Sequence, residues 1–534
     1  MRKFYSYGPV DTDLHFYSPR TALIDDATAR LVGDDPNKGG HYITVWAPRQ
    51  TGKTWTMQQV MQKIKHNHDF EVGIITMQSA KEDTDSQSVL DIFVQGLRDW
   101  FERDFPDVIE WKQLASLFTS TYFSKPVILI IDEFDSLEDP FINRFASEFR
   151  TIHTKRSNQI SRNSAEKRFL LHGLALIGVR SVLGIENTSG SPFNVQKSVH
   201  MPNLTATEVQ DLFRWYEQES GQRLLPEVVE RIYDEFQGQP GLTCWMGELL
   251  TETHNRHDTE ITLFDFNTAY TDALDEQPNN NILNIIAKAK MTQYTPTVLS
   301  MYKTNRKLAF RYDNPVTNYL YMNGVVGREL VREPSGINKR YLKFPSPFVQ
   351  KRLFNYFADD LFMDLEGLYD SRIDLSTIIT ETHLDIPNLL QLYESYLQQN
   401  RRQLFRNAPR RKTDERIYEA VYHFNFYMYL TQFLADYDAS VYPEFPTGNG
   451  KIDLLITHNG THYWLELKSF ANQVQYRKAL TQAAAYAAQL KVAQIWLVFF
   501  VEMMDDERRV SLETAYRDAV TGVVVQPLFV EIVE

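Results

Sequence analysis

Two stretches near the amino terminus have the hydrophobic pattern of buried strands. In "KPVILIIDEFDSL", five consecutive apolar residues, 127–131, follow Pro126 and lead into Asp132 and Glu133, which is typical of a central parallel strand. The second stretch is "YITVW". It is followed by "APRQTGKT" and then by apolar residues at helical spacing, Val60, Met61 and Ile64. The pattern therefore predicts an α/β fold that contains a strand, a loop and a helix in this order.

The loop "APRQTGKT" has the residues that bind the phosphates of a nucleotide. In such a loop, backbone N–H groups surround phosphate at a helix amino terminus, Lys53 reaches the outer phosphates, and the Thr54 hydroxyl binds Mg²⁺. Ala47 stands where the usual pattern begins with glycine, and Gly52 is retained. Taken alone, the loop is also compatible with a plain turn between a strand and a helix.

The acids after the strand at 127–131 complete this candidate site, because ligands of open α/β sheets gather at the carboxyl ends of strands. Asp132 is expected to hold the Mg²⁺ shell, and Glu133 to polarise the attacking water. A later strand, "FLLHGLALIGVR", ends at Arg180. Arg180 is either a sensor of the γ-phosphate or a solvated arginine at a strand end.

The segments "APRQTGKTW", "LIIDEFDSL" and "FQGQPGL" resemble AAA-like ATPases of the P-loop class, over roughly residues 1–275. The resemblance implies an ATPase core at 1–200 and a helical lid at 201–280, with Thr205 or Thr207 capping a lid helix. It also implies that Arg20, in "FYSPRTALID", lies near adenine. The implied ATP-binding residues are Ala47, Pro48, Arg49, Gln50, Thr51, Gly52, Lys53, Thr54, Asp132 and Arg180.

The pattern changes between residues 281 and 365. Short helical stretches are followed by "YLYMNGVVGREL" and "INKRYLKFPSPFVQKRLFNYF", which suggest two strands around a turn. This order resembles a winged-helix unit. We favour a structural bridge over a unit that reads DNA.

Strict alternation marks the stretch "HYWLELKSF". Glu466 and Lys468 point to one face of the predicted strand, and Leu465 and Leu467 point to the other. An edge strand with a solvated face explains this pattern equally well. A preceding strand, "KIDLLI", and the turn "HNGT" predict a hairpin that brings Asp453 next to Glu466. Two carboxylates and the carbonyl of Leu467 would give Mg²⁺ an oxygen site, and Lys468 would orient or deprotonate a water.

Residues 412–505 resemble the PD-(D/E)XK nuclease superfamily, and in particular the nuclease domains that are joined to AAA-like ATPases. Asp453 matches the family's first metal-binding acid, and Glu466 with Lys468 matches its Glu-x-Lys element. Ile452 stands where the family has a proline before that first acid. Glu419 matches the acid on the family's first helix, and the pair Gln482 and Tyr486 matches the helix that follows the core strands. The resemblance implies a nuclease-like domain over 366–534, including a helical lead-in, that uses Mg²⁺ or Mn²⁺.

The densest positive run extends from Arg401 to Lys412, with five arginines, one lysine and no acid. Such a run is usually a solvated loop. Before a nuclease-like segment, it is a candidate clamp for phosphates.

Composition adds limits to this picture. The chain has 534 residues and one cysteine, and a single cysteine excludes a disulfide framework within the chain. Its net charge of −13 argues against non-specific coating of nucleic acid. No secretory signal or membrane span is recognisable, so we expect a cytoplasmic protein without membrane partners. A homo-oligomer is compatible with the sequence.

The combined prediction is an ATP-dependent or ATP-regulated DNA nuclease, with RNA as the other possible substrate. The combination suggests, by analogy, defence against foreign DNA. The rival prediction is an ATP-binding switch whose carboxyl-terminal domain binds nucleic acid or protein without cutting.

Overall fold

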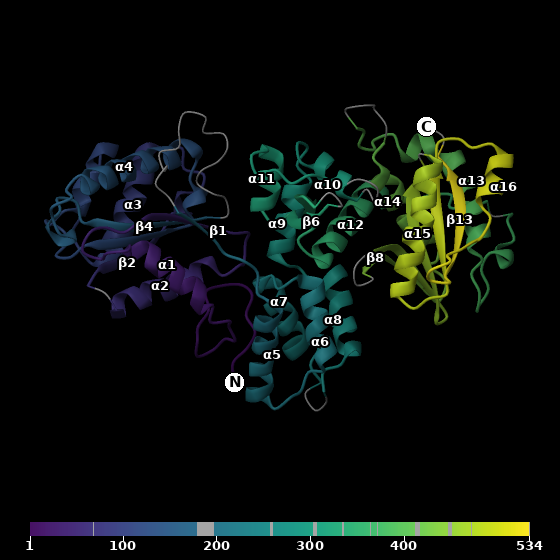
Figure 1. Ribbon diagram of the computed structural model, residues 1–534, viewed down its shortest axis with the longest axis horizontal. Coiled ribbons are helices and arrows are strands. Elements are labelled where there is room, and N and C mark those ends of the chain that lie inside the picture. The colour runs from purple at the N-terminus through teal and green to yellow at the C-terminus, as the bar shows by residue number, and fades with distance from the viewer. Residues whose placement is uncertain are drawn as a thin grey trace. The chain divides into compact units, whose positions relative to one another are not determined.

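The computed structural model divides the chain into two compact units (Figure 1). The first comprises Met1–Ile285 and Arg311–Val326, and the second comprises Ile286–Phe310 and Gly327–Glu534. The residues described are 1–67, 69–178, 197–256, 260–302, 307–333, 336–363, 365–370, 372–411, 417–446, 451–470 and 472–532. No helix among them is both long and apolar enough to cross a membrane.

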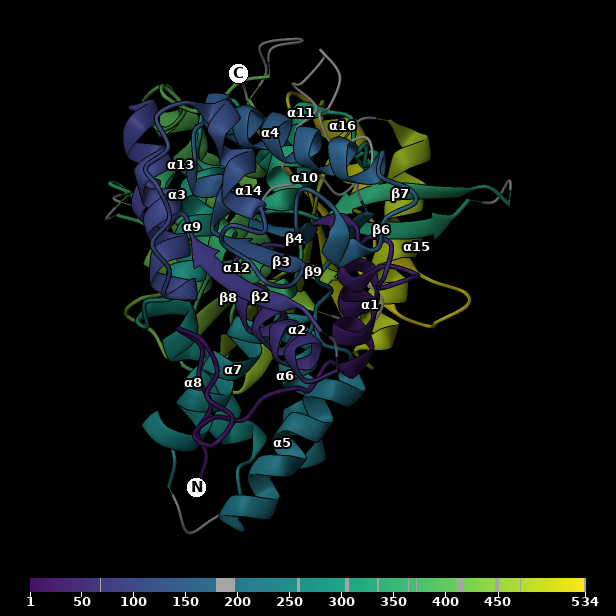
Figure 2. The ribbon, with the colours of Figure 1, turned by 90° about the vertical axis from the view of Figure 1, so that its left-hand side faces the viewer.

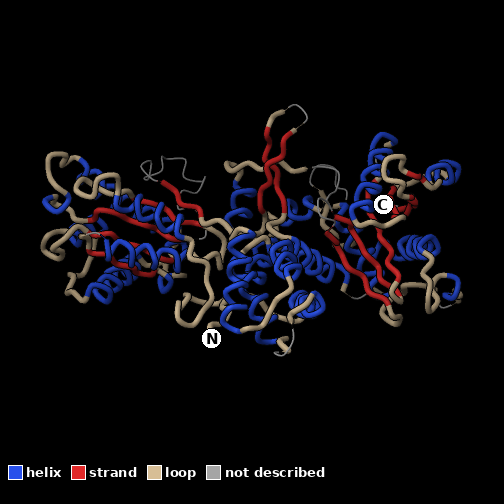
Figure 3. The backbone as a smooth tube through the Cα atoms, turned by 60° about the horizontal axis from the view of Figure 1, so that its bottom comes forward, coloured by secondary structure: helices blue, strands red, loops and turns tan. Residues whose placement is uncertain are grey.

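The first unit is built on a five-stranded sheet in the order β2-β3-β4-β1-β5. All its pairings are parallel. This confirms the predicted α/β fold with a parallel sheet, whose strands are drawn in red in Figure 3. The strands are β1 (Tyr42–Trp46), β2 (Glu71–Thr76), β3 (Val127–Asp132), β4 (Leu171–Gly178) and β5 (Lys197–His200).

Helices cover both faces of this sheet, which explains why its central strands are apolar throughout. In β3, Ile128 and Ile130 pack with the helices α1 (Thr21–Val32) and α2 (Lys53–Asn67). The alternate residues of β3 pack with α3 (Ser86–Phe101) and α4 (Asp139–Ser157) on the opposite face. Figure 2 shows the sheet between these two helical layers.

A group of helices follows the sheet in the same unit. They are α5 (Ala206–Ser220), α6 (Pro226–Phe236), α7 (Pro240–Glu248) with a π-helical turn at Leu249–Thr253, and α8 (Leu263–Asp275). Of the two predicted caps, Thr205 is the one used: its side chain accepts a hydrogen bond from the Glu208 N–H in a capping box. The helix α11 (Pro315–Met322) also belongs to this unit, although it lies far along the chain.

The helix α9 (Asn280–Ala289) contains the boundary at which the second unit begins, at Ile286, and α10 (Thr295–Met301) follows in that unit. The strands β6 (Gly327–Arg332) and β7 (Asn338–Lys343) pair as an antiparallel hairpin, and α12 (Pro347–Phe362) follows. The predicted bridge at 281–365 therefore contributes residues to both units. Short 3₁₀ segments lie at Gln78–Ala80, Trp111–Phe118, Phe134–Ser136, Ser164–Glu166 and Leu375–Thr377.

A six-stranded mixed sheet in the order β12-β13-β11-β10-β9-β8 forms the centre of the second unit. The strands β10 (Thr461–Ser469), β11 (Gln494–Val501) and β13 (Val524–Glu531) are parallel. The neighbours β8 (Ala439–Pro446), β9 (Lys451–His458) and β12 (Tyr516–Arg517) run antiparallel to their partners.

The two faces of this sheet are covered by different helices. The helix α15 (Gln473–Gln489) packs on the face that carries Trp464 and Phe499. On the other face, Phe500 contacts the rings of Tyr422 and Phe426 in α14 (Glu419–Phe433). The helix α13 (Ile386–Leu404) also contacts β13, and α16 (Asp506–Leu512) follows β11.

Candidate functional site

The loop between β1 and α2 has the backbone shape of an anion site. Gln50 and Gly52 have positive φ angles of 56° and 81°, and Thr51 Oγ1 donates to the Pro48 carbonyl at 2.9 Å. Glycine is suited to this left-handed conformation because it has no Cβ. The first N–H groups of α2 have no partner within the helix, so they are available to phosphate oxygens.

Lys53 lies over this loop. Its Nζ donates to the carbonyl oxygens of Ala47, at 3.1 Å, and Pro48, at 3.0 Å. Burial lowers the pKa of Lys53, although the carboxylates of Asp135, Glu133 and Asp132 oppose this effect. A bound polyphosphate would place further negative charge next to this buried ammonium group.

Asp132 and Thr54 meet at the carboxyl end of β3. Thr54 Oγ1 donates to Asp132 Oδ2 at 2.6 Å, and Asp132 Oδ1 accepts the Glu133 N–H at 2.9 Å. These hydroxyl and carboxylate oxygens suit Mg²⁺, which prefers oxygen ligands.

Glu133 stands next to this pair and has a left-handed backbone, with φ of 50°. Burial raises the pKa of Glu133, as do the charges of Asp135 and Asp132, while Lys53 opposes them. A carboxyl group with a raised pKa is suited to accepting a proton from water. Sequence reasoning missed Asp135, although the repeated acids of "DEFD" are a usable signal.

A contact that the sequence did not predict joins the loop to the group of helices that follows the sheet. The Gln239 side chain donates to the carbonyls of Arg49, at 3.0 Å, and Gln50, at 3.3 Å. The Gly241 N–H also donates to the Gln50 carbonyl, at 3.0 Å. The segment "FQGQPGL" therefore lies directly against the phosphate loop.

A cavity of about 900 Å³ lies beside α1 and α5, and Tyr17, Arg20 and Trp215 line it. The ring of Tyr17 contacts that of Trp55, the residue after Thr54, which places the cavity near the phosphate loop. The Arg20 guanidinium donates to the Pro202 carbonyl at 2.7 Å. Burial lowers the pKa of Arg20, and Glu208 partly offsets this. Arg180, the predicted sensor of the γ-phosphate, lies outside the described residues.

The second candidate site lies in the six-stranded sheet. Glu466 and Lys468 are almost fully buried, and Lys468 Nζ lies 2.5 Å from Glu466 Oε1. In the β9–β10 hairpin Leu454 faces Leu465, so one residue further Asp453 comes opposite Glu466. Asp453 Oδ2 accepts the Leu467 N–H at 2.7 Å. The structure thus brings the three predicted side chains together, on the sheet face that α15 covers.

The charges of this cluster determine the protonation of Lys468. Burial lowers the pKa of Lys468, but the neighbouring Glu466 and Asp453 carboxylates raise it by more, so the pKa lies above its ordinary value. Lys468 is therefore a cation at neutral pH. This property suits it to orient a group or stabilise negative charge better than to accept a proton.

The other predicted nuclease residues lie around this cluster. Glu419, the first residue of α14, accepts the Ser469 N–H at 2.9 Å. Gln482 Nε2 donates to Tyr486 Oη at 2.6 Å, and Tyr486 is close enough to raise the pKa of Lys468. Glu419 therefore lies at the end of β10, Tyr486 lies near Lys468, and Gln482 contacts Tyr486.

The donor atoms of this cluster suit Mg²⁺ in their chemistry, since they are carboxylate and carbonyl oxygens. Across the described residues, no group of three or more His, Cys, Asp or Glu side chains is arranged to hold a metal ion. Glu466 is instead paired with Lys468. The Mg²⁺ site predicted from Asp453, Glu466 and the Leu467 carbonyl therefore stays a prediction.

The comparisons with known proteins bear on the first unit. Residues 5–304 match the AAA-like domain family, so the chain belongs to this family and contains an ATPase-type domain. Nucleotide binding is implied by this membership. A comparison with curated proteins finds no match.

Several solved structures align with the chain. A Walker-type ATPase of Pyrococcus abyssi aligns with 10% identity and a TM-score of 0.42, covering 66% of this chain and 99% of the other. The Aeropyrum pernix ORC1 protein, solved in complex with DNA, has 14% identity and a TM-score of 0.34, with coverages of 64% and 93%. Thermotoga maritima RuvB has 13% identity and a TM-score of 0.32, with coverages of 60% and 89%.

Proposed function

We propose that this protein is an ATP-dependent or ATP-regulated nuclease that cleaves phosphodiester bonds in DNA. The observation that carries the proposal is the buried Glu466–Lys468 pair with Asp453 beside it. Removing charged groups from water costs free energy that an ion pair often does not recover, so a purely structural role would add little to the stability of the fold.

In the first unit, the proposed cofactor is ATP with Mg²⁺. The N–H groups of residues 51–54 and the Lys53 ammonium would bind the phosphates, and the cavity lined by Tyr17 and Arg20 would hold the base. Thr54 and Asp132 would hold Mg²⁺, which neutralises phosphate charge when it is bound. Glu133 would accept the proton of the attacking water.

In the second unit, Asp453, Glu466 and the Leu467 carbonyl would hold Mg²⁺ or Mn²⁺, which activates water when it is bound. Lys468, as a cation, would stabilise charge on the phosphate. Glu419 would fix the end of β10 through its bond to Ser469, and Gln482 would position Tyr486 near Lys468.

The proposed substrate is DNA, and RNA is the alternative. Residues 401–411 of the basic run fall within the described residues and Lys412 outside them. Arginine contacts to phosphates supply most non-specific affinity for nucleic acid, so this run would hold the backbone. A homo-oligomer and a role in defence against foreign DNA are part of the same proposal and rest on analogy.

One observation favours the second candidate, an ATP-binding switch that does not cut. Glu466 is engaged by Lys468, and the described residues contain no cluster of three metal-binding side chains. If this ion pair persists when nucleic acid and metal are present, the site would be inert. The cleavage assay separates the two candidates.

The test is incubation of plasmid, linear DNA and RNA with Mg²⁺ or Mn²⁺, with and without ATP. We expect cleavage by the natural protein, arrest by EDTA, and a loss of about 10² to 10⁴ in rate in Asp453→Ala, Glu466→Ala and Lys468→Ala. All three variants should still hydrolyse ATP, since the first unit is unchanged. Binding of DNA and ATP without any cleavage by the natural protein would instead establish the switch.

A further inference from the structure

The second unit contains a small cavity that is lined by part of the basic run, and no particular group of the substrate has been assigned to it so far. Its volume is about 280 Å³, and the side chains of Arg401, Arg402, Arg406 and Arg410 line it. Glu531 is the single acid in its lining, and its carboxylate accepts the Met504 N–H at 2.9 Å. Four arginines around one cavity contrast with the net charge of −13 of the chain.

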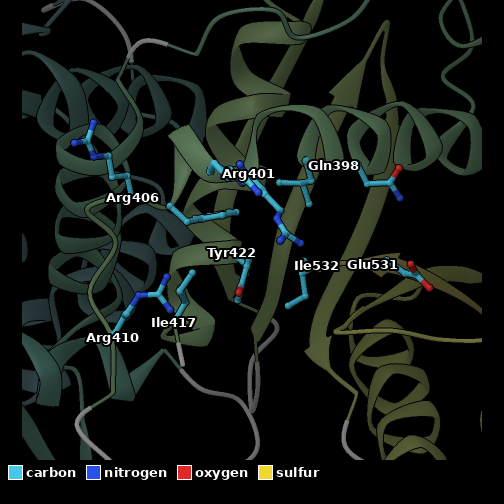
Figure 4. A pocket seen from close by; sticks show the side chains of 11 residues that line it. Gln398, Arg401, Arg406, Arg410, Ile417, Tyr422, Glu531 and Ile532 are labelled. Atoms are coloured by element: carbon cyan, nitrogen blue, oxygen red, sulfur yellow. The ribbon is translucent and has the colours of Figure 1, made fainter. Parts of the chain in front are cut away.

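Apart from Gln398, the remaining walls are apolar or aromatic. Tyr422 of α14 and Ile532, which follows β13, line the cavity. Figure 4 shows Arg401 and Arg410 on either side of Tyr422, while the head group of Arg406 points away from it. Guanidinium groups bind phosphate through two parallel hydrogen bonds, and an aromatic side chain can support a sugar or base. The lining is therefore suited to a phosphate group attached to a nucleoside.

We propose that this cavity binds the terminal phosphate monoester of a nucleic-acid strand; the inference rests on the proposed nuclease function. A phosphate monoester carries about −1.5 to −2 charges at pH 7, more than the single charge of an internal phosphodiester, so it gains more from the arginines whose head groups face the cavity. The volume lies just below the range of about 300 to 1,000 Å³ that is usual for ligand pockets, and it fits one phosphate with part of a nucleoside.

The cavity lies at the edge of the sheet that also carries the nuclease-like cluster. Its residues Glu531 and Ile532 stand at the carboxyl end of β13, where the Ile532 N–H donates to the Val501 carbonyl at 2.7 Å. The parallel strand β10 ends at this edge too, at Ser469. Since β10 and β13 are two strand spacings apart, their ends are about 10 Å apart.

A strand bound by its end would run from the cavity along this edge. A strand that spans this separation and also crosses from one face of the sheet to the other needs several nucleotides, at about 3.4 Å per stacked nucleotide. The cavity lies on the α14 side, because Tyr422 stacks on Phe500, whereas Glu466 and Lys468 face α15. The strand would therefore cross the edge near Glu419, whose carboxylate binds Ser469 there.

The test measures binding by the full chain, in EDTA so that no cleavage occurs, to labelled single strands of one sequence. The strands carry a 5′-phosphate, a 3′-phosphate or only hydroxyl ends. We expect one phosphorylated strand to bind about tenfold more tightly than the hydroxyl strand, and Arg401→Gln/Arg410→Gln to abolish this difference. Arg372→Gln, which removes an exposed arginine outside the cavity, should keep it. Unchanged melting temperatures show that the variants fold.

Equal binding of all three strands by the natural protein would overturn the proposal, as would a preference that survives in Arg401→Gln/Arg410→Gln. Inorganic phosphate and dTMP serve as competitors, and displacement at the concentration of the oligonucleotide would assign the cavity to a free nucleotide instead of a strand end. Binding is measured independently of cleavage. Tighter binding of a phosphorylated strand without any cleavage in the nuclease assay would contradict the proposed nuclease and support the phosphate site. Cleavage without tighter binding of a phosphorylated strand would support the nuclease and contradict the phosphate site.

Discussion

Glu133 is a residue whose environment and proposed role agree. Burial and two neighbouring carboxylates raise its pKa, while Lys53 limits the effect. The residues "GKT" and "DE" were recognisable from the sequence because their chemistry depends on local order. The position of Asp135 next to Lys53 was not, because it depends on the fold of the turn after β3.

We expect Glu133→Gln to bind ATP as tightly as the natural protein and to hydrolyse it about 10² to 10⁴ times more slowly, since the amide cannot accept a proton. Lys53→Ala should lose ATP binding itself, because it removes the ammonium over the loop. Equilibrium binding and single-turnover hydrolysis distinguish these defects. Full turnover in both variants would remove the ATPase assignment.

Among elements, the strands of the parallel sheet were the most predictable, because β3 is buried on both faces and has no polar residue before Asp132. The charged strand β10 was also recognisable from its alternation, although its burial was not: Glu466 and Lys468 are nearly inaccessible to solvent. An edge strand and an inner strand can share one pattern, and only the neighbours decide between them.

The start of α7 depends on a side chain with two functions. Gln239 caps the helix by accepting the Leu242 N–H, and its amide also donates to the carbonyls of the phosphate loop. No pattern in the sequence predicts this contact, because 189 residues separate Gln239 from Gln50. The helix therefore holds the loop in position.

We expect Gln239→Ala to destabilise the first unit by about 1 kcal/mol, the usual cost of a lost cap. It should also weaken ATP binding several-fold, because the loop loses two hydrogen bonds. Gln218→Ala, in which an exposed side chain on α5 is shortened, is the control and should change neither value. Thermal melting and titration with ATP measure the two effects, and equal ATP affinity in both variants would show that the contact is not functional.

At the scale of the whole molecule, the unexpected feature is α11. Residues 311–326 return to the first unit, where Gly324 lies against Pro48 of the phosphate loop. The ring of Tyr321 also contacts that of Trp46, at the end of β1. Sequence reasoning placed this segment in a bridge, because the pattern of a short helix does not reveal its partner.

We expect Gly324→Ala to weaken ATP binding several-fold. A Cβ at this position would lie 2.9 Å from Pro48 Cβ, so the phosphate loop would have to move. Gly221→Ala is a matched control, since Gly221 has the same φ of +74° and no atom within 4 Å of an added Cβ. Both variants share the backbone strain of about 1 to 2 kcal/mol, and only the first should change the affinity for ATP.

The path of the chain limits how the two units can be exchanged or separated. It passes between them three times, after Ile285, Phe310 and Val326. A domain that is fused to the end of another domain is joined to it at one peptide junction. Replacing either unit of this chain would require three peptide junctions to fit the new unit at the same time. A single nick in residues 286–310 would likewise leave α11 on the carboxyl-terminal fragment. Through α11, this fragment would stay non-covalently bound to the amino-terminal fragment. The two fragments should therefore still purify together as one complex.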